Sequence, residues 1–196
     1  MEIVEVMVRR QDAKADKSKD QFATRDWSKK TERIIVGIFI VIAFIIRSQI
    51  IEYHSFVSWD GTNYVNYFRD ADWQHVFPPG YPIFIELFRF FISDGVLAAQ
   101  WVSIVFSCLL IIPLFYLARH FLSSHLALLV TVLASFNPLM LRNGVVSLSE
   151  MQYIFFVISA FYFYYKKLPL WFGLSCGLAY LTRPEALVFI GIICLY

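Results

Sequence analysis

Long uncharged apolar segments alternate with short polar segments along most of the chain. A helix rises about 1.5 Å per residue, so about 20 apolar residues cross the hydrocarbon core of a bilayer. The pattern predicts an all-α fold, a polytopic transmembrane helix bundle with about five spans and a truncated sixth. The predicted spans comprise residues 34–51, 95–118, 121–141, 151–165 and 168–182, and the truncated run comprises residues 186–196.

Arg47 is the one charged residue within the first apolar run, and it lies near the end of that run. Long cationic side chains at the end of a span usually extend along the helix toward water. We therefore expect the Arg47 guanidinium to lie at the membrane interface.

The first segment between predicted spans, residues 52–94, is long and rich in aromatic residues. Most connections in compact domains have about 4–6 residues, and much longer ones are commonly functional. Aromatic rings favour the headgroup zone of a membrane, so we expect an amphipathic interfacial helix within this segment. Its aromatic residues include Trp59, Tyr64, Tyr67, Phe68, Trp73 and Phe77.

The composition supports a membrane protein and divides the chain into two parts. Hydrophobic residues make up 59% and charged residues 16%, with a mean hydropathy of +0.61. Soluble domains have roughly 45–50% apolar and about 25% charged residues. Residues 1–33 hold nine of the 17 Lys and Arg and seven of the 15 Asp and Glu. This mixture of signs predicts a solvated tail at 1–33 that does not bind nucleic acid, followed by a transmembrane domain at 34–196.

The distribution of basic residues predicts the orientation in the membrane. Lys and Arg in short segments next to spans are enriched on the cytoplasmic side. With the basic tail inside, Arg119 and the pair Lys166-Lys167 are also cytoplasmic, and we expect a multi-pass protein of a prokaryotic inner membrane. The outer segments are then 52–94, 142–150 and 183–185, and these hold every Asp and Glu after residue 33.

Asp60 follows the outer end of the first predicted span, and two roles are open to it. A carboxylate near a region of low dielectric constant has a raised pKa and can act as a base. Asp is also a favoured N-cap of a helix. The local sequence favours the role of N-cap over the role of a base.

Four further charged residues lie in the other two outer segments. Arg142 and Arg183 are both outside in this orientation, against the usual bias, which indicates a role such as binding a phosphate. Glu185 lies two residues after Arg183. The alternative is an ion pair between Arg183 and a glutamate that joins two helix ends. Glu150 at the start of a predicted span also suits an ordinary acidic first turn.

Several of these segments, taken in order, resemble the GT-C superfamily of polytopic membrane glycosyltransferases. The resemblance is to the branch with protein O-mannosyltransferases and lipid A aminoarabinose transferases. The first outer loop reads DGTNY at 60–64 and PPGYP at 78–82. The turn at 142–150 is similar to the family segment that provides a second acidic group. The sequence GLAYLTRPE at 177–185 is similar to a recurrent family signature and is the most specific part.

The resemblance covers about residues 34–196 and implies a function. It implies an inverting transfer of a sugar from a polyprenyl-phosphate donor, with Asp60 as the base. Arg183 and Arg142 would bind the lipid phosphate, and Glu150 would act at the acceptor or a metal. Tyr64 and Glu185 complete the expected substrate-binding set.

The resemblance leaves the cofactor, the acceptor and the sugar unassigned. Many relatives have Asp-Glu where this chain has Asp60-Gly61, so no ligand motif supports a divalent metal there. Relatives continue through further spans, so we expect the chain to be an N-terminal part of such an enzyme. The alternative is a non-catalytic membrane protein that binds a lipid-linked substrate, either a truncated or degenerate relative or a transporter-like bundle. The chain lacks the repeated halves of a typical transporter.

Overall fold

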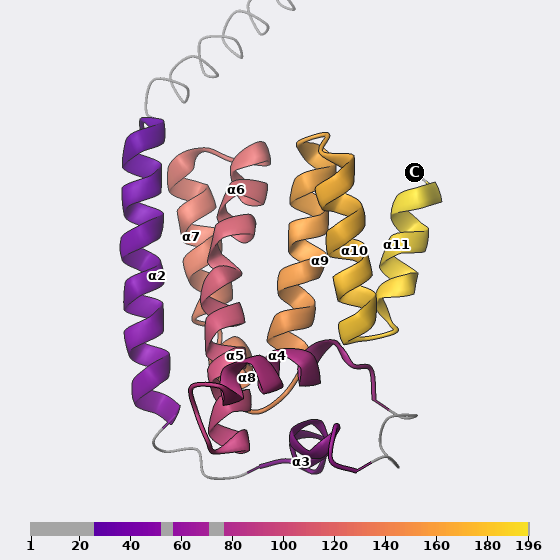
Figure 1. Cartoon of the computed structure of the whole chain (residues 1–196). Helices are drawn as coiled ribbons and strands as arrows, with labels where there is room; N and C mark the ends of the chain where they lie inside the picture. Colours follow the sequence, from indigo (N-terminus) through magenta and orange to yellow (C-terminus); the bar gives the residue numbers. More distant parts are fainter. Residues whose placement is uncertain (1–25, 52–56, 71–76, 196) are drawn as a thin grey trace, which may run out of the picture.

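The chain is all-α in the part that is described. A computed structural model describes residues 26–51, 57–70 and 77–195 (Figure 1), and within these ranges every regular element is a helix. Residues 1–25 of the expected tail at 1–33 lie outside the described residues, as do the parts of the expected outer loop at 52–56 and 71–76, Trp73 included. The helices are α2 (Lys29–Ile51), α3 (Trp59–Asn66), α4 (Gly80–Arg89), α5 (Gly95–Leu109), α6 (Ile111–Phe121), α7 (Ser124–Ser135), α8 (Pro138–Asn143), α9 (Glu150–Tyr165), α10 (Pro169–Thr182) and α11 (Ala186–Leu195).

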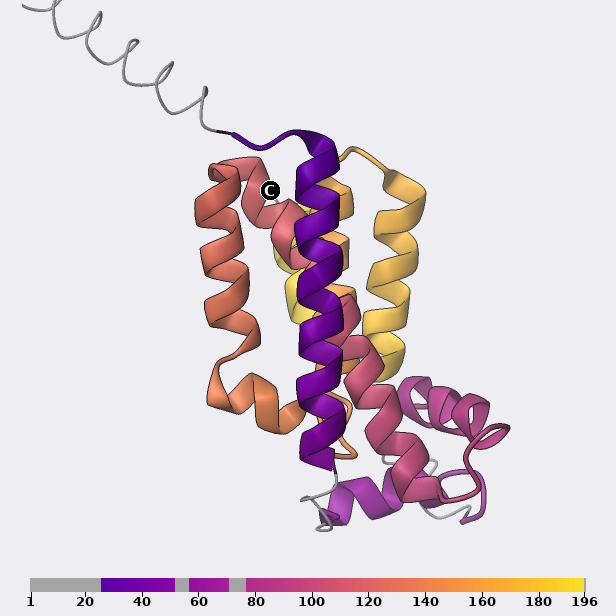
Figure 2. The same cartoon turned by 90° about the vertical axis from the view of Figure 1, so that its left-hand side faces the viewer.

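Among the described residues, two helices are long and apolar enough to cross a membrane. They are α2, with 23 residues, and the nearly continuous run Gly95–Phe121 formed by α5 and α6, with 27 residues. Pro113 has no N–H to donate to the preceding turn, which explains the one-residue break at Leu110 between α5 and α6. In the most apolar part of α2 only 22% of residues are buried, against 56% in Gly95–Phe121. Figure 2 shows α2 along the outside of the bundle.

The other predicted spans correspond to shorter helices. The expected span at 121–141 is divided, because α7 ends at Ser135 and α8 begins at Pro138. A residue before proline is disfavoured in a helix, and the Asn137 side chain instead accepts a hydrogen bond from the Leu139 N–H at 2.9 Å. The helices α9 and α10 have 16 and 14 residues and form the most extensive helix pair.

The described part of the segment between α2 and α5 contains the helices α3 and α4. The helices α3 and α4 lie across the lower end of the bundle in Figure 1, together with α8. Ser58 is the N-cap of α3, and its hydroxyl accepts from the Gly61 N–H at 3.1 Å. The prediction that Asp60 caps this helix is therefore wrong. Both residue types are good caps, so the local sequence did not determine where the helix begins.

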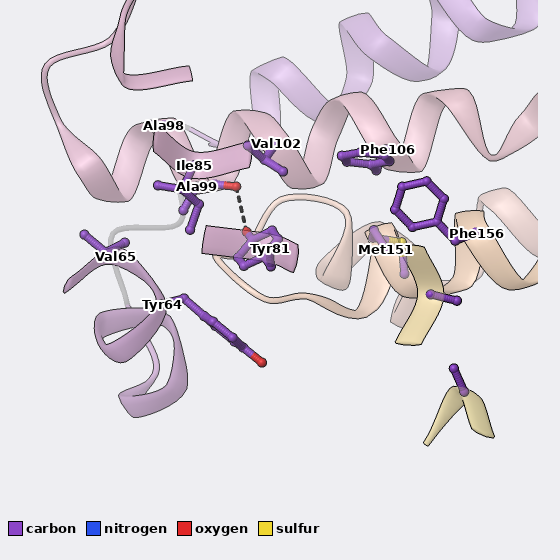
Figure 3. Close-up of a cluster of buried hydrophobic side chains, with 12 residues drawn as sticks. Tyr64, Val65, Tyr81, Ile85, Ala98, Ala99, Val102, Phe106, Met151 and Phe156 are labelled. Carbon is purple, nitrogen blue, oxygen red and sulfur yellow. Dashed lines mark hydrogen bonds between the residues drawn. The ribbon is translucent and has the colours of Figure 1, made fainter. Parts of the chain in front are cut away.

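A buried tyrosine connects α4 to the centre of the bundle. Tyr81 is fully buried, and its hydroxyl lies 2.8 Å from both the Ala99 carbonyl and the Ser103 hydroxyl of α5 (Figure 3). The Ser103 hydroxyl donates in turn to the Leu148 carbonyl at 3.1 Å, just before α9. Burial raises the pKa of Tyr81, so that its phenol stays protonated as a donor. This chain of hydrogen bonds holds α4, α5 and the start of α9 in register.

Arg47 is buried among helices and does not reach the surface. Only 1% of the residue is exposed, and its guanidinium donates to the carbonyls of Ala43 at 3.3 Å and Ser135 at 2.9 Å. The expectation of an interfacial guanidinium is therefore wrong. Its surroundings include Ser107 of α5 and Ser135 of α7, which are remote in the sequence.

An ionic network joins the first described residues to the turn between α6 and α7. This network lies at the end of the bundle away from α3 and α4. Arg119 on α6 contacts Asp26 and donates to the Glu32 carboxylate at 2.7 Å. Glu32 also accepts from the Ser124 hydroxyl at 2.7 Å. A hydrogen bond from the Ser124 N–H and the charge of Arg119 lower the pKa of Asp26. These contacts fasten the start of α2 to the α6–α7 turn.

The contact of Gly80 with α10 generates a test of the fold. A Cβ at residue 80 would lie 2.5 Å from the Leu181 carbonyl oxygen and 2.8 Å from the Thr182 nitrogen, and both are backbone atoms. We expect Gly80→Ala to reduce stability by at least about 1–3 kcal/mol, measured by thermal unfolding in detergent. Gly173→Ala is the control, because no atom lies within 4 Å of its added Cβ. Equal Tm values for the two variants would contradict this contact.

Candidate functional site

Three segments that are far apart in the sequence meet at the lower end of the bundle. They are the helix α3, the start of α9 and the turn between α10 and α11 (Figure 1). Two side-chain contacts join them, one between Tyr64 and Ser149 and one between Arg183 and Glu150. The charged network of Asp26, Glu32 and Arg119 lies at the other end of the bundle, where α2 begins and α6 ends.

Tyr64 is the buried member of this group. Its hydroxyl lies 3.1 Å from the Ser149 hydroxyl, and either group can be the donor. Its ring packs edge-on against Phe77 at 4.9 Å and Tyr81 at 5.2 Å between centroids. Burial raises the pKa of Tyr64, although the hydrogen bond from Ser149 and the charge of Arg183 oppose this shift. The phenol is therefore neutral near pH 7 and can donate or accept a hydrogen bond.

Arg183 and Glu150 form an ion pair at a meeting of two helix ends. The Arg183 Nη1 lies 3.0 Å from Glu150 Oε1, and its Nε lies 3.7 Å from Glu185 Oε2. Glu150 opens α9, where a carboxylate is favourable to the helix dipole. Burial lowers the pKa of Arg183, but the charges of Glu150 and Glu185 outweigh it and the net shift is upward. The guanidinium is therefore a permanent cation, and about a third of the side chain is exposed.

Asp60 lies beside this group with an exposed side chain. It occupies the first turn of α3, one helical turn before Tyr64 and on the same face. Its charge contributes to the raised pKa of Tyr64. Because Ser58 fulfils the capping role, the Asp60 carboxylate is available to other partners.

Arg142 lies apart from the other predicted site residues. It is exposed in the last turn of α8, and within the described residues it forms no ion pair. The structure thus brings together Tyr64, Glu150, Arg183 and Glu185, with Asp60 one turn away.

Buried amides add polar atoms that the sequence analysis did not select. Gln152 donates to the Gly80 carbonyl at 3.2 Å, while its Oε1 is buried without a partner among the described residues. The Asn63 Nδ2 and the Glu150 Oε2 are also buried without a hydrogen-bond partner among the described residues. Buried polar atoms without partners are uncommon, and a ligand is one way to satisfy them. The signal in the sequence was an amide close to a candidate residue, since Asn63 precedes Tyr64 and Gln152 follows Glu150 by two residues.

The arrangement offers hydrogen-bonding groups and the cation of Arg183. Within the described residues, no group of three or more His, Cys, Asp or Glu side chains is placed to hold a metal ion.

We compared the chain with protein families, curated proteins and solved structures. No family model, no curated protein and no solved structure matches the chain.

The contact between Tyr64 and Ser149 generates a double-mutant test. Removing either hydroxyl leaves the other buried and unpaired, so Tyr64→Phe and Ser149→Ala should each cost about 1 kcal/mol in the free energy of unfolding. The double variant should lose less free energy of unfolding than the two single variants lose together, and the difference should be about 0.5–1.5 kcal/mol. Tyr180→Phe is the control, because Tyr180 is exposed. Strictly additive losses would contradict the contact.

Proposed function

We propose that the protein is a multi-pass membrane glycosyltransferase of the GT-C kind, or the N-terminal part of one. It transfers a sugar from a polyprenyl-phosphate donor to an acceptor at the outer face of the membrane. The observation that carries the proposal is the meeting of Tyr64, Glu150 and Arg183, with Asp60 beside them. These are the residues on which the resemblance to the family depends.

The proposal includes about five membrane spans, although in the described part of the chain only two helices are long enough to cross the bilayer by themselves. At about 1.5 Å per residue, α9 and α10 rise about 24 and 21 Å. We propose that α3, α4 and α8, lying across one end of the bundle, occupy the remaining depth. Irregular backbone is tolerated at membrane depth where protein surrounds it.

The proposed orientation places the candidate site outside the cell. The end with Arg119, Lys166 and Lys167 would be cytoplasmic by the bias of basic residues. The opposite end carries Asp60, Glu150 and Arg183. At that boundary a donor lipid lies in the bilayer while its phosphate can contact the Arg183 guanidinium.

The proposed reaction needs a base and a cation for the leaving group. The acceptor hydroxyl attacks the anomeric carbon while the Asp60 carboxylate takes its proton. The bond from the anomeric carbon to the phosphate oxygen breaks, and polyprenyl phosphate leaves with the electron pair. Arg183 stabilises the charge that develops on this phosphate. The attack from the opposite side inverts the anomeric configuration.

A second candidate function has one observation in its favour. The Arg183 charge is already compensated by Glu150 at 3.0 Å, as in an ion pair that only joins helix ends. In this alternative the protein is a non-catalytic binder of lipid-linked sugar. The two functions differ in the outcome of the variants below.

Arg183→Ala tests the binding of the donor. We expect it to weaken binding of polyprenyl-phosphate mannose by about tenfold or more, because a charge-assisted hydrogen bond contributes about 1.5–3 kcal/mol. Glu150→Gln frees the guanidinium and should tighten binding. The measurement is titration of the detergent-solubilised protein, with the exposed Arg69→Ala as the control. Unchanged affinity in both Arg183→Ala and Glu150→Gln would refute the phosphate role.

Asp60→Asn tests the transfer itself. The amide keeps the shape of the side chain but cannot take a proton, so transfer of labelled mannose should fall by about 10²–10⁴-fold. Binding of the donor should stay within about twofold of the original, since Asp60 contacts the acceptor side. Transfer at the original rate would remove Asp60 from the mechanism, and an unaltered chain that binds the donor without transferring it would favour the non-catalytic alternative.

A further inference from the structure

Arg47 is a buried cation without an anionic partner in the described part of the chain. Its two hydrogen bonds go to backbone carbonyls, and its Nε is buried with no hydrogen-bond partner. The ion pairs among the described residues all belong to other arginines. The Ser135 carbonyl at the C-terminal end of α7 offsets part of the charge through the helix dipole. A guanidinium removed from water normally requires a full counter-charge.

A cavity of about 150 Å³ adjoins this guanidinium. Besides Arg47, the polar residues of its wall are Ser107 and Ser135. The rest of the wall is apolar and includes Ala134 of α7 and Met151, Ile154 and Ile158 of α9. The spacing of the last three places them on one face of α9. The cavity thus has a cation within otherwise hydrocarbon-like walls.

We infer that this cavity binds a single-chain anionic lipid, with a phosphate or carboxylate head group on Arg47 and its chain between α7 and α9. An oxyanion supplies the missing counter-charge and an acceptor for the free N–H. The apolar wall favours a hydrocarbon chain over water or a small hydrated ion. The lipid would fasten α2 to α7 and α9.

This lipid site is separate from the candidate functional site. Glu150 contacts Arg183 between α9 and α10, whereas Met151, Ile154 and Ile158 line the cavity with Ala134 of α7. The inference does not rest on the proposed glycosyltransferase function, because it depends only on Arg47 and its surroundings.

The test is direct binding of defined probes to the full chain in a neutral detergent. Decyl phosphate and decanoate should bind and raise Tm, decanol should bind at least about tenfold more weakly, and inorganic phosphate should bind more weakly still. Arg47→Gln should weaken binding of decyl phosphate by about tenfold or more and leave binding of decanol unchanged. Arg69→Gln is the matched control for the loss of one arginine, and its affinity should equal that of the original protein.

A second variant keeps the test decisive if Arg47→Gln does not fold. Ala134→Phe retains the arginine but fills part of the cavity, so it should also weaken binding of decyl phosphate. Equal binding of decanol and decyl phosphate, or unchanged affinity in Ala134→Phe, would overturn the inference. Inorganic phosphate that binds as tightly as decyl phosphate would identify an anion site instead of a lipid site. If Arg47 only caps α7, none of the charged probes will raise Tm.

Discussion

The close contact between the Gly80 backbone and the last turn of α10 determines where the functional end of the molecule is built. The absence of a side chain lets α4 begin directly against Leu181 and Thr182. Arg183 is the next residue after this contact, so its guanidinium starts from a fixed point. The Gly80 carbonyl also accepts from Gln152, which brings α9 to the same place. Gly80 of α4 thus contacts both α9 and α10, and the three helices meet next to the ion pair of Arg183 and Glu150.

Tyr81 extends this arrangement toward α3 and α5. Its hydroxyl is fixed by Ala99 and Ser103, and its ring contacts Tyr64 at 5.2 Å between centroids. Tyr64 in turn meets Ser149, one residue before Glu150. The candidate site is therefore supported by a continuous series of rings and hydroxyls. Each polar atom in the series is placed by a helix that is itself packed on the core.

The apolar pattern of the sequence was sufficient to predict an all-helical chain, because segment length and composition largely determine helix formation here. It could not predict which residue caps a helix, such as Ser58 rather than Asp60 at the start of α3. Such details depend on which of several suitable residues meets a neighbour. The burial of Arg47 and the contact of Tyr64 with Ser149 depend on residues 88 and 85 positions away. Periodicity within a single helix carries no information about contacts at such distances.

The position of α2 along the outside of the bundle has a consequence for the order in which the chain assembles. The Glu32 carboxylate accepts hydrogen bonds from Arg119 and Ser124, which lie 87 and 92 residues later in the chain. The Arg47 guanidinium donates to the Ser135 carbonyl, which lies 88 residues later in the chain. During synthesis α2 is therefore made long before the groups that its Glu32 and Arg47 side chains contact. These contacts of α2 can form only after α7 has been made, although α2 is the first of the described helices to leave the ribosome.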